Sequence, residues 1–122
     1  MGIEADTAVN IARTMILPAA LQHQELLAGA LGSLEAAGVK SPDQKKALEE
    51  FVVLVSALRK ATARLEKAAS HQSDDPYKHA LHIRNDVKPA MSELREIVDT
   101  LETWVSSEYW PLPTYQDMLF LE

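Results

Sequence analysis

The sequence contains no cysteine, which excludes disulfide bridges, thiolate metal ligands and thiol nucleophiles. Its longest apolar run, Phe51–Val55, is far shorter than the roughly 20 residues that a bilayer-spanning helix needs. Basic residues are also few, with twelve Lys and Arg against eighteen Asp and Glu and a net charge of −6. No basic stripe is present that could neutralise phosphates. We therefore expect neither a membrane nor a nucleic-acid partner.

The length of 122 residues fits one domain rather than two. No charged and then apolar leader opens the chain, so we expect a cytoplasmic location. The terminal pairs 1–2 and 121–122 resemble additions made during cloning. On that interpretation the natural sequence ends at Phe120 and was cut from something longer.

Scarce glycine and plentiful alanine, leucine and glutamate favour helix throughout the chain. Apolar residues recur every three or four positions in three stretches, which predict helices over about 3–37, 42–70 and 76–108. Similar lengths and short connections predict an all-α fold, an antiparallel up-down-up three-helix bundle. The predicted core face of the third helix is Tyr77, Ala80, Arg84, Val87, Met91, Leu94, Val98, Leu101 and Val105.

Local signals mark the predicted helix ends. Gly38 suits a C-terminal stop, because glycine adopts positive φ at little cost. Ser41 before Pro42, with Gln44 three residues after the serine, forms a capping box at the start of the second helix. Asp75-Pro76 repeats the same start for the third.

Two prolines, Pro18 and Pro89, fall inside the first and third predicted helices. Proline removes a backbone hydrogen bond and clashes with the carbonyl four residues earlier, so we expect each to kink its helix by more than about 20°. The alternative, that each proline starts a new helix, would break two apolar faces that otherwise continue through it.

The tail, residues 110–120, differs from the rest of the chain. Trp110-Pro111-Leu112-Pro113 must be extended, because each proline disfavours helix in the residue before it. Tyr115 and Phe120 add further large apolar surface. We expect this tail to be ordered and to dock on the bundle or on a neighbour.

Few side chains suggest chemistry. His79, His82 and Asp86 are spaced to converge on one helix, as two histidines and a carboxylate do in some zinc or iron sites. No further ligand on a second helix is identifiable, so we interpret them as an ordinary polar face. His23, alone on an apolar stripe, is interpreted as a structural residue. We predict no catalytic, cofactor-binding or metal-binding residue in this chain.

Arg84 is the most informative polar residue, because it falls on the predicted core face of the third helix. A charge there is costly unless it is paired. We expect a carboxylate partner on a facing helix or on a neighbouring domain. The first helix is apolar on nearly every side around Ile11–Leu21, which predicts a further covering partner.

Several stretches together resemble the C-terminal end of type III glutamine synthetases. The motif Trp-Pro-x-Pro-x-Tyr at 110–115 is the most specific of them, and the pieces span nearly the whole chain. They are Glu4-Ala5, Thr7, Ile11-Ala12, Ile16–Ala19, Arg84–Met91, Leu94-Arg95, Asp99, Leu101-Glu102, Trp110–Tyr115 and Met118–Phe120.

The resemblance implies a parent enzyme, a glutamate–ammonia ligase that uses ATP and a divalent metal and assembles as two stacked hexameric rings. Those cofactors and the catalytic residues would lie in an upstream catalytic domain, so this chain alone is expected to be no enzyme. It would be an accessory or assembly domain whose partners are that catalytic domain and neighbouring subunits of a homo-oligomer. Arg84, Pro18, Pro89, Trp110, Pro111, Pro113, Tyr115 and Phe120 are its predicted structural or interface residues.

Two other interpretations remain open. A free-standing helical interaction module would explain the apolar periodicity and the apolar first helix, but it leaves the specific tail unexplained. A metal enzyme with its site in the bundle core needs paired glutamate and histidine motifs on several helices, and these are missing.

Overall fold

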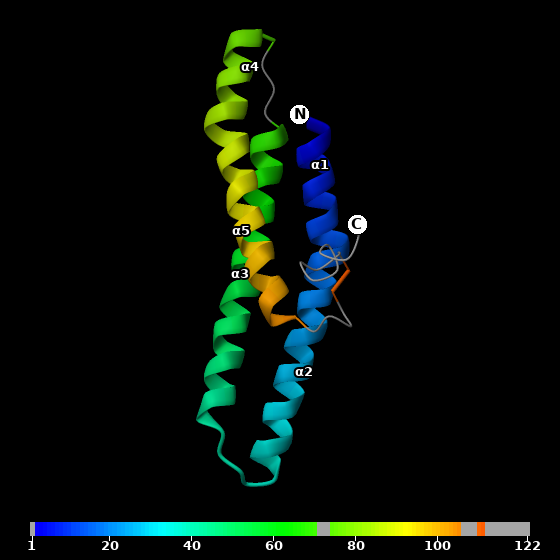
Figure 1. The fold of residues 1–122 in the computed structure, drawn as a ribbon, viewed down its shortest axis with the longest axis vertical. Coiled ribbons are helices and arrows are strands. Elements are labelled where there is room, and N and C mark those ends of the chain that lie inside the picture. Colours follow the sequence, from blue (N-terminus) through cyan, green and yellow to red (C-terminus); the bar gives the residue numbers. More distant parts are fainter. Residues whose placement is uncertain (1, 71–73, 106–109, 112–122) are drawn as a thin grey trace, which may run out of the picture.

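The computed structural model describes residues 2–70, 74–105 and 110–111, and its helices form an antiparallel up-down-up bundle (Figure 1). The predicted all-α fold is therefore confirmed. Three rods run side by side: the first is α1, η1 and α2, the second is α3, and the third is α4, η2 and α5. Their bounds are α1 Gly2–Ile11, η1 Ala12–Ile16, α2 Leu17–Ala36, α3 Pro42–Ser70, α4 Pro76–His82, η2 Ile83–Val87 and α5 Lys88–Trp104.

Helix α3 is the central element, because both other rods pack against it. Its buried side chains form a continuous stripe in the core. That stripe is Phe51, Val55, Leu58, Ala61, Thr62 and Leu65. The buried Thr62 hydroxyl donates to the Leu58 carbonyl at 2.7 Å, so its polar atom is satisfied within the helix.

Two exposed ion pairs join α3 to the rods on either side. Arg13 of η1 binds Glu66 through both guanidinium nitrogens, and Arg64 binds Glu93 of α5. The hydrogen bond from Arg13 lowers the pKa of Glu66 below its ordinary value. Because both pairs are open to solvent, they contribute less to stability than the apolar core between the rods.

The turn between the first and second rods is closed by backbone hydrogen bonds. Val39 N donates to the Leu34 carbonyl at 2.9 Å and Gly38 N to the Glu35 carbonyl at 3.0 Å, the Schellman pattern. Gly38 has φ 78°, the left-handed conformation that the sequence predicts for this glycine. At the start of α4 the Asp75 carboxylate accepts from Tyr77 N at 2.9 Å, which confirms the predicted cap.

Each mid-rod proline follows a π-helical segment. In η1 the N–H of Leu17 bonds to the carbonyl of Ala12, and in η2 the N–H of Lys88 bonds to the carbonyl of Ile83, five residues back in both cases. Pro18 and Pro89 come directly after these bonds. The wider π-turn relieves the clash between a proline ring and the preceding turn. Backbone angles stay right-handed helical at both junctions, so each rod is continuous. The size of the predicted kinks stays a prediction.

The π-segment in the third rod changes which residues face the core. A π-turn holds one residue more than an α-turn, so it rotates everything before it relative to α5. Tyr77, Ala80 and Arg84 are exposed, and the core face predicted through them is wrong. The partly buried residues of this region are His79, Leu81, His82 and Ile83. From Val87 onward the predicted face holds, with Val87, Leu94, Leu101 and Val105 buried.

The third rod also ends earlier than the sequence predicts. Val105 has extended angles of φ −74° and ψ 137°, so α5 stops at Trp104 and not near Glu108. Trp110, the first residue of the tail, is buried in the same core as the helices, with 9% of its surface exposed. Pro111 is half-buried. Pro113, Tyr115 and Phe120 lie outside the described residues.

Replacing Leu65 with alanine should lower the free energy of unfolding by about 2–5 kcal/mol, because Leu65 is fully buried and its loss leaves a cavity. Leu26→Ala is the matched control, since Leu26 is 52% exposed and should change stability by less than about 0.5 kcal/mol. Urea unfolding followed by circular dichroism measures both. Equal losses would contradict the burial of α3 described above.

Candidate functional site

The described residues contain no group of three or more His, Asp or Glu side chains placed to hold a metal ion. Within the same residues, no helix is both long enough and apolar enough to cross a bilayer. Four polar or surface features remain: a histidine network at the end of α3, a histidine at the edge of the core, an apolar groove and a set of exposed apolar side chains.

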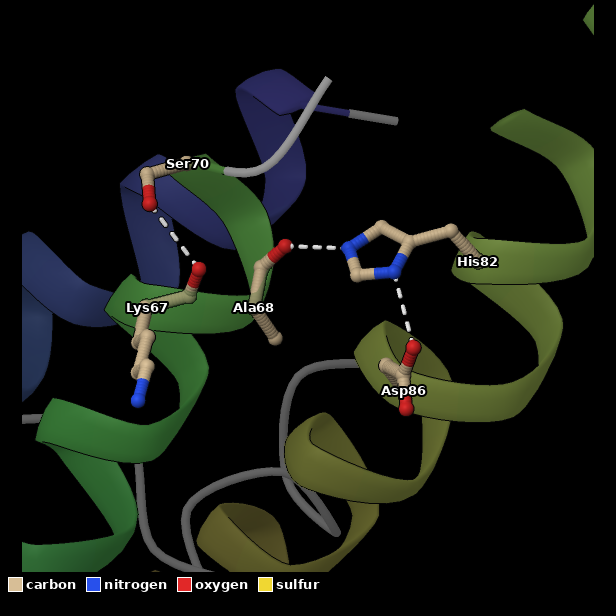
Figure 2. A network of polar contacts seen from close by, with 5 residues as sticks. All are labelled: Lys67, Ala68, Ser70, His82 and Asp86. Carbon is tan, nitrogen blue, oxygen red and sulfur yellow. Dashed lines mark hydrogen bonds and ion pairs between the residues drawn. The ribbon is translucent and has the colours of Figure 1, made fainter. Parts of the chain in front are cut away.

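The histidine network joins the end of α3 to the third rod (Figure 2). His82, the last residue of α4, lies with Nε2 2.6 Å from the Ala68 carbonyl oxygen and Nδ1 2.8 Å from Asp86 Oδ2. The Ser70 hydroxyl donates to the Lys67 carbonyl at 2.9 Å beside it. The last four carbonyls of any helix lack partners within that helix. His82 therefore caps α3 from a neighbouring helix.

Both neighbours of the His82 ring are hydrogen-bond acceptors. A neutral imidazole carries one N–H and donates to one of them, whereas the doubly protonated ring donates to both. The His82 ring thus links the Ala68 carbonyl at the end of α3 to the Asp86 carboxylate.

The alternative of a metal site at His79, His82 and Asp86 gains no support from this arrangement. Both nitrogens of His82 already face hydrogen-bond partners within the described residues. His79 is half-buried, and its Nδ1 has no hydrogen-bond partner in the part of the chain that the structure describes. The three residues form a histidine–carboxylate pair and a separate histidine.

His23 lies at the edge of the core, as a structural residue would. Its ring meets Phe51 edge-on at 5.0 Å between centroids, and Phe51 in turn contacts Trp104 at 5.6 Å. Burial lowers the pKa of His23 below 6.5. Its Nδ1 is buried without a hydrogen-bond partner among residues 2–70, 74–105 and 110–111.

An apolar groove lies between the first rod and α5, and we call it the α1–α5 groove. Its volume is about 350 Å³. Only two polar residues, Ser92 and Arg95, line it, and both are exposed. The lining residues are Ala8, Ile11, Ala12, Ile16, Met91, Ser92, Leu94, Arg95 and Val98.

Apolar side chains are also exposed on the outside of the bundle. Met15, Leu21 and Leu26 of the first rod are 38%, 37% and 52% exposed. Val52 and Val53 of α3 are 44% and 69% exposed. Met15, Leu21 and Leu26 therefore leave part of the apolar surface of the first rod open to solvent.

The predicted interface residues that the structure describes differ in their surroundings. Arg84 is exposed and forms no ion pair within the described ranges, so a partner on a facing helix is not found there. A partner on a neighbouring domain stays a prediction. Pro18 and Pro89 are exposed on different rods, and the buried Trp110 has an indole N–H without a hydrogen-bond partner in the described part. Sequence reasoning missed the His82 cap and the groove.

Comparison with known proteins gives one consistent relationship. The type-3 glutamine synthetase of Dictyostelium discoideum is 31% identical over 127 aligned positions, which cover 98% of this chain and 17% of that protein. A glutamine synthetase of Bacteroides fragilis (strain YCH46) is 29% identical, covering 97% of this chain and 17% of its own length. No protein-family model and no solved structure matches.

The predicted resemblance to type III glutamine synthetases is thus confirmed, as a similarity to one region of a larger protein. The chain spans less than a fifth of the length of these relatives.

Replacing His82 with alanine should lower the free energy of unfolding by about 1–3 kcal/mol, because it leaves the partly buried Ala68 carbonyl without its partner. Asp86→Ala removes only the second contact, and Asp86 is 59% exposed, so its cost should stay below about 1 kcal/mol. Urea titration of both variants measures the difference. A larger loss for Asp86→Ala would show that the cap on α3 is unimportant.

His23 should make the folded state less stable in acid. Because its folded pKa is lowered, the unfolded chain binds a proton more readily than the folded chain below pH 6.5. The free energy of unfolding should therefore fall as pH drops through 6.5 toward the folded-state pKa, and His23 should have no effect above that range. In His23→Leu this part of the pH dependence should disappear, whereas Gln24→Leu should keep it. Urea unfolding of each variant at several pH values measures it, and an unchanged slope in His23→Leu would contradict the assignment.

Proposed function

We propose that this chain is a non-catalytic accessory and assembly domain from the C-terminal end of a protein related to type-3 glutamine synthetase. The observation that carries the proposal is the alignment, which takes in 98% of this chain and only 17% of the Dictyostelium protein. A region that aligns along its whole length, and is a small fraction of the relative, is what a separate structural unit of a larger enzyme would give.

The parent protein would join ammonia to glutamate at the expense of ATP. Phosphoryl transfer of this kind needs nucleotide phosphates and divalent metal held in place by oxygen and nitrogen ligands. ATP and metal would bind in an upstream catalytic domain. The isolated chain would bind neither, and the parent would act in the cytoplasm.

The outer surface of the bundle supports a role in assembly. Exposed apolar side chains on the first rod and on α3 are costly in water and are stabilised when another surface covers them. Leu26 and Val53 are the most exposed leucine and valine among the described residues, and they mark the two surfaces. Their partners would be the catalytic domain and neighbouring subunits of a homo-oligomer.

A free-standing helical interaction module is the second candidate, and the same exposed side chains favour it. The two differ in the size of the natural polypeptide. If the chain belongs to a larger enzyme, an antibody raised against it should detect, in the source cells, a protein with several times its mass of 13.5 kDa. A band at 13.5 kDa would favour the free-standing module.

In the parent protein, Leu26→Glu and Val53→Glu should each weaken assembly, because each puts a charge into a surface that becomes buried. Gln22→Glu and Ser56→Glu add the same charge at exposed polar positions of the same helices and serve as controls. Light scattering after size-exclusion chromatography gives the assembly state. If neither apolar site alters it, these surfaces are not the ones used in assembly.

The purified 122-residue chain should form no glutamine from glutamate, ammonia and ATP. The expected reason is that the nucleotide and metal ligands belong to another part of the parent protein. A coupled assay for ADP release, together with chromatographic detection of glutamine, measures it. Turnover by pure chain would overturn the proposed accessory role.

A further inference from the structure

We propose that the α1–α5 groove is the docking site of this chain's own C-terminal segment, residues 112–120, bound within the same molecule. The segment lies outside the described residues, and the argument rests on the groove, on the neighbouring Trp110 and on the chemistry of the segment. This proposal does not depend on the proposed function.

The groove needs an apolar occupant. Its floor includes the buried Ala12, Ile16 and Leu94, and its walls include the half-buried Ile11, Met91 and Val98. An apolar surface of this kind that opens toward solvent is stabilised by a segment that excludes water from it. Of the nine residues 112–120, five are large and apolar: Leu112, Tyr115, Met118, Leu119 and Phe120.

The charges of groove and segment are complementary. Arg95 is the one charged residue that lines the groove, and it forms no ion pair among the described residues. Asp117 is the one charged residue of segment 112–120. An Arg95–Asp117 pair at the rim would orient an otherwise apolar contact.

The chain between the end of α5 and Asp117 is long enough for Asp117 to reach Arg95. Arg95 lies nine residues before the end of α5 at Trp104, which at 1.5 Å per residue is about 14 Å along the helix. The thirteen residues from Val105 to Asp117 can reach about 40 Å when extended. Trp110 already belongs to the core that contains Ala12, Ile16 and Leu94, so the segment starts from an anchored residue.

Binding within one molecule is favoured over binding by a second copy. A short tether to an anchored Trp110 gives the segment an effective concentration in the millimolar range. Pro111 and Pro113 further restrict the unbound chain and so reduce the entropy lost on docking. The bound segment would add a direct link between the first rod and α5.

The absence of cysteine permits a direct test by engineered cross-linking. If Asp117 meets Arg95 and the segment runs back along α5, Leu119 comes close to Ser92, one helical turn before Arg95. Ser92→Cys combined with Leu119→Cys should form an intramolecular disulfide about tenfold faster than Ser56→Cys combined with Leu119→Cys. Ser56 is an exposed serine of α3 outside the groove, so the two pairs carry identical substitutions.

The charge pair is tested in the Ser92→Cys, Leu119→Cys background. Arg95→Glu alone and Asp117→Arg alone should each slow the cross-link by about two- to fivefold, the effect expected of an exposed ion pair. The double exchange, Arg95→Glu with Asp117→Arg, should restore it. Unchanged helical circular dichroism before oxidation shows that each variant is folded.

Three outcomes would overturn the proposal. Equal oxidation rates for the Ser92 and Ser56 pairs would show that the segment does not select the groove. Disulfide-linked dimers in place of a cross-linked monomer, separated on a non-reducing gel, would assign the groove to a second copy. Failure of the double exchange to recover the rate would remove the Arg95–Asp117 contact.

Discussion

The burial of α3 on two sides is the constraint on which the rest of the structure depends. Phe51, Leu58 and Leu65 are almost completely buried, because α3 packs against both the first rod and the third. Each of the two flanking rods covers one side of α3. Other apolar side chains of these rods line the groove or lie on the outer surface. The groove is therefore a consequence of the arrangement: two rods on a shared central helix meet less closely than each meets α3.

Much of this fold could be predicted from the sequence, because its signals are local. The Schellman turn at Gly38, the cap at Asp75 and the stripe from Phe51 to Leu65 each follow from a few neighbouring residues. The predicted face of the third helix failed before Val87 for a similarly definite reason. The prediction from periodicity assumes 3.6 residues per turn throughout the helix. The π-segment η2 holds one extra residue, which the amino-acid sequence does not indicate.

The polar features could not be predicted, because they depend on which helices become neighbours. His82 meets the carbonyl of Ala68 from another helix, and a backbone carbonyl has no sequence signal. The sequence indicates that Trp110 belongs to a tail that docks on another surface, but its burial in the core depends on where α5 ends. The relationship to glutamine synthetases was recognisable from motifs, since a pattern such as residues 110–115 is specific without any knowledge of its contacts.

The two π-segments have a consequence for how this domain tolerates changes of length. A π-turn is an α-helix that has absorbed a one-residue insertion, and here each is followed, after one intervening residue, by a proline. Deleting one residue within Ile83–Val87 would restore α-helical spacing and turn α4 by about 100° relative to α5, since 3.6 residues complete a turn. His82 would then leave the end of α3, while the core from Val87 to Leu101 would keep its register. The packing of the third rod from Val87 onward therefore does not depend on how many residues precede Val87 in that rod. Changes of length in α4 and η2 can accumulate without disturbing this part of the core.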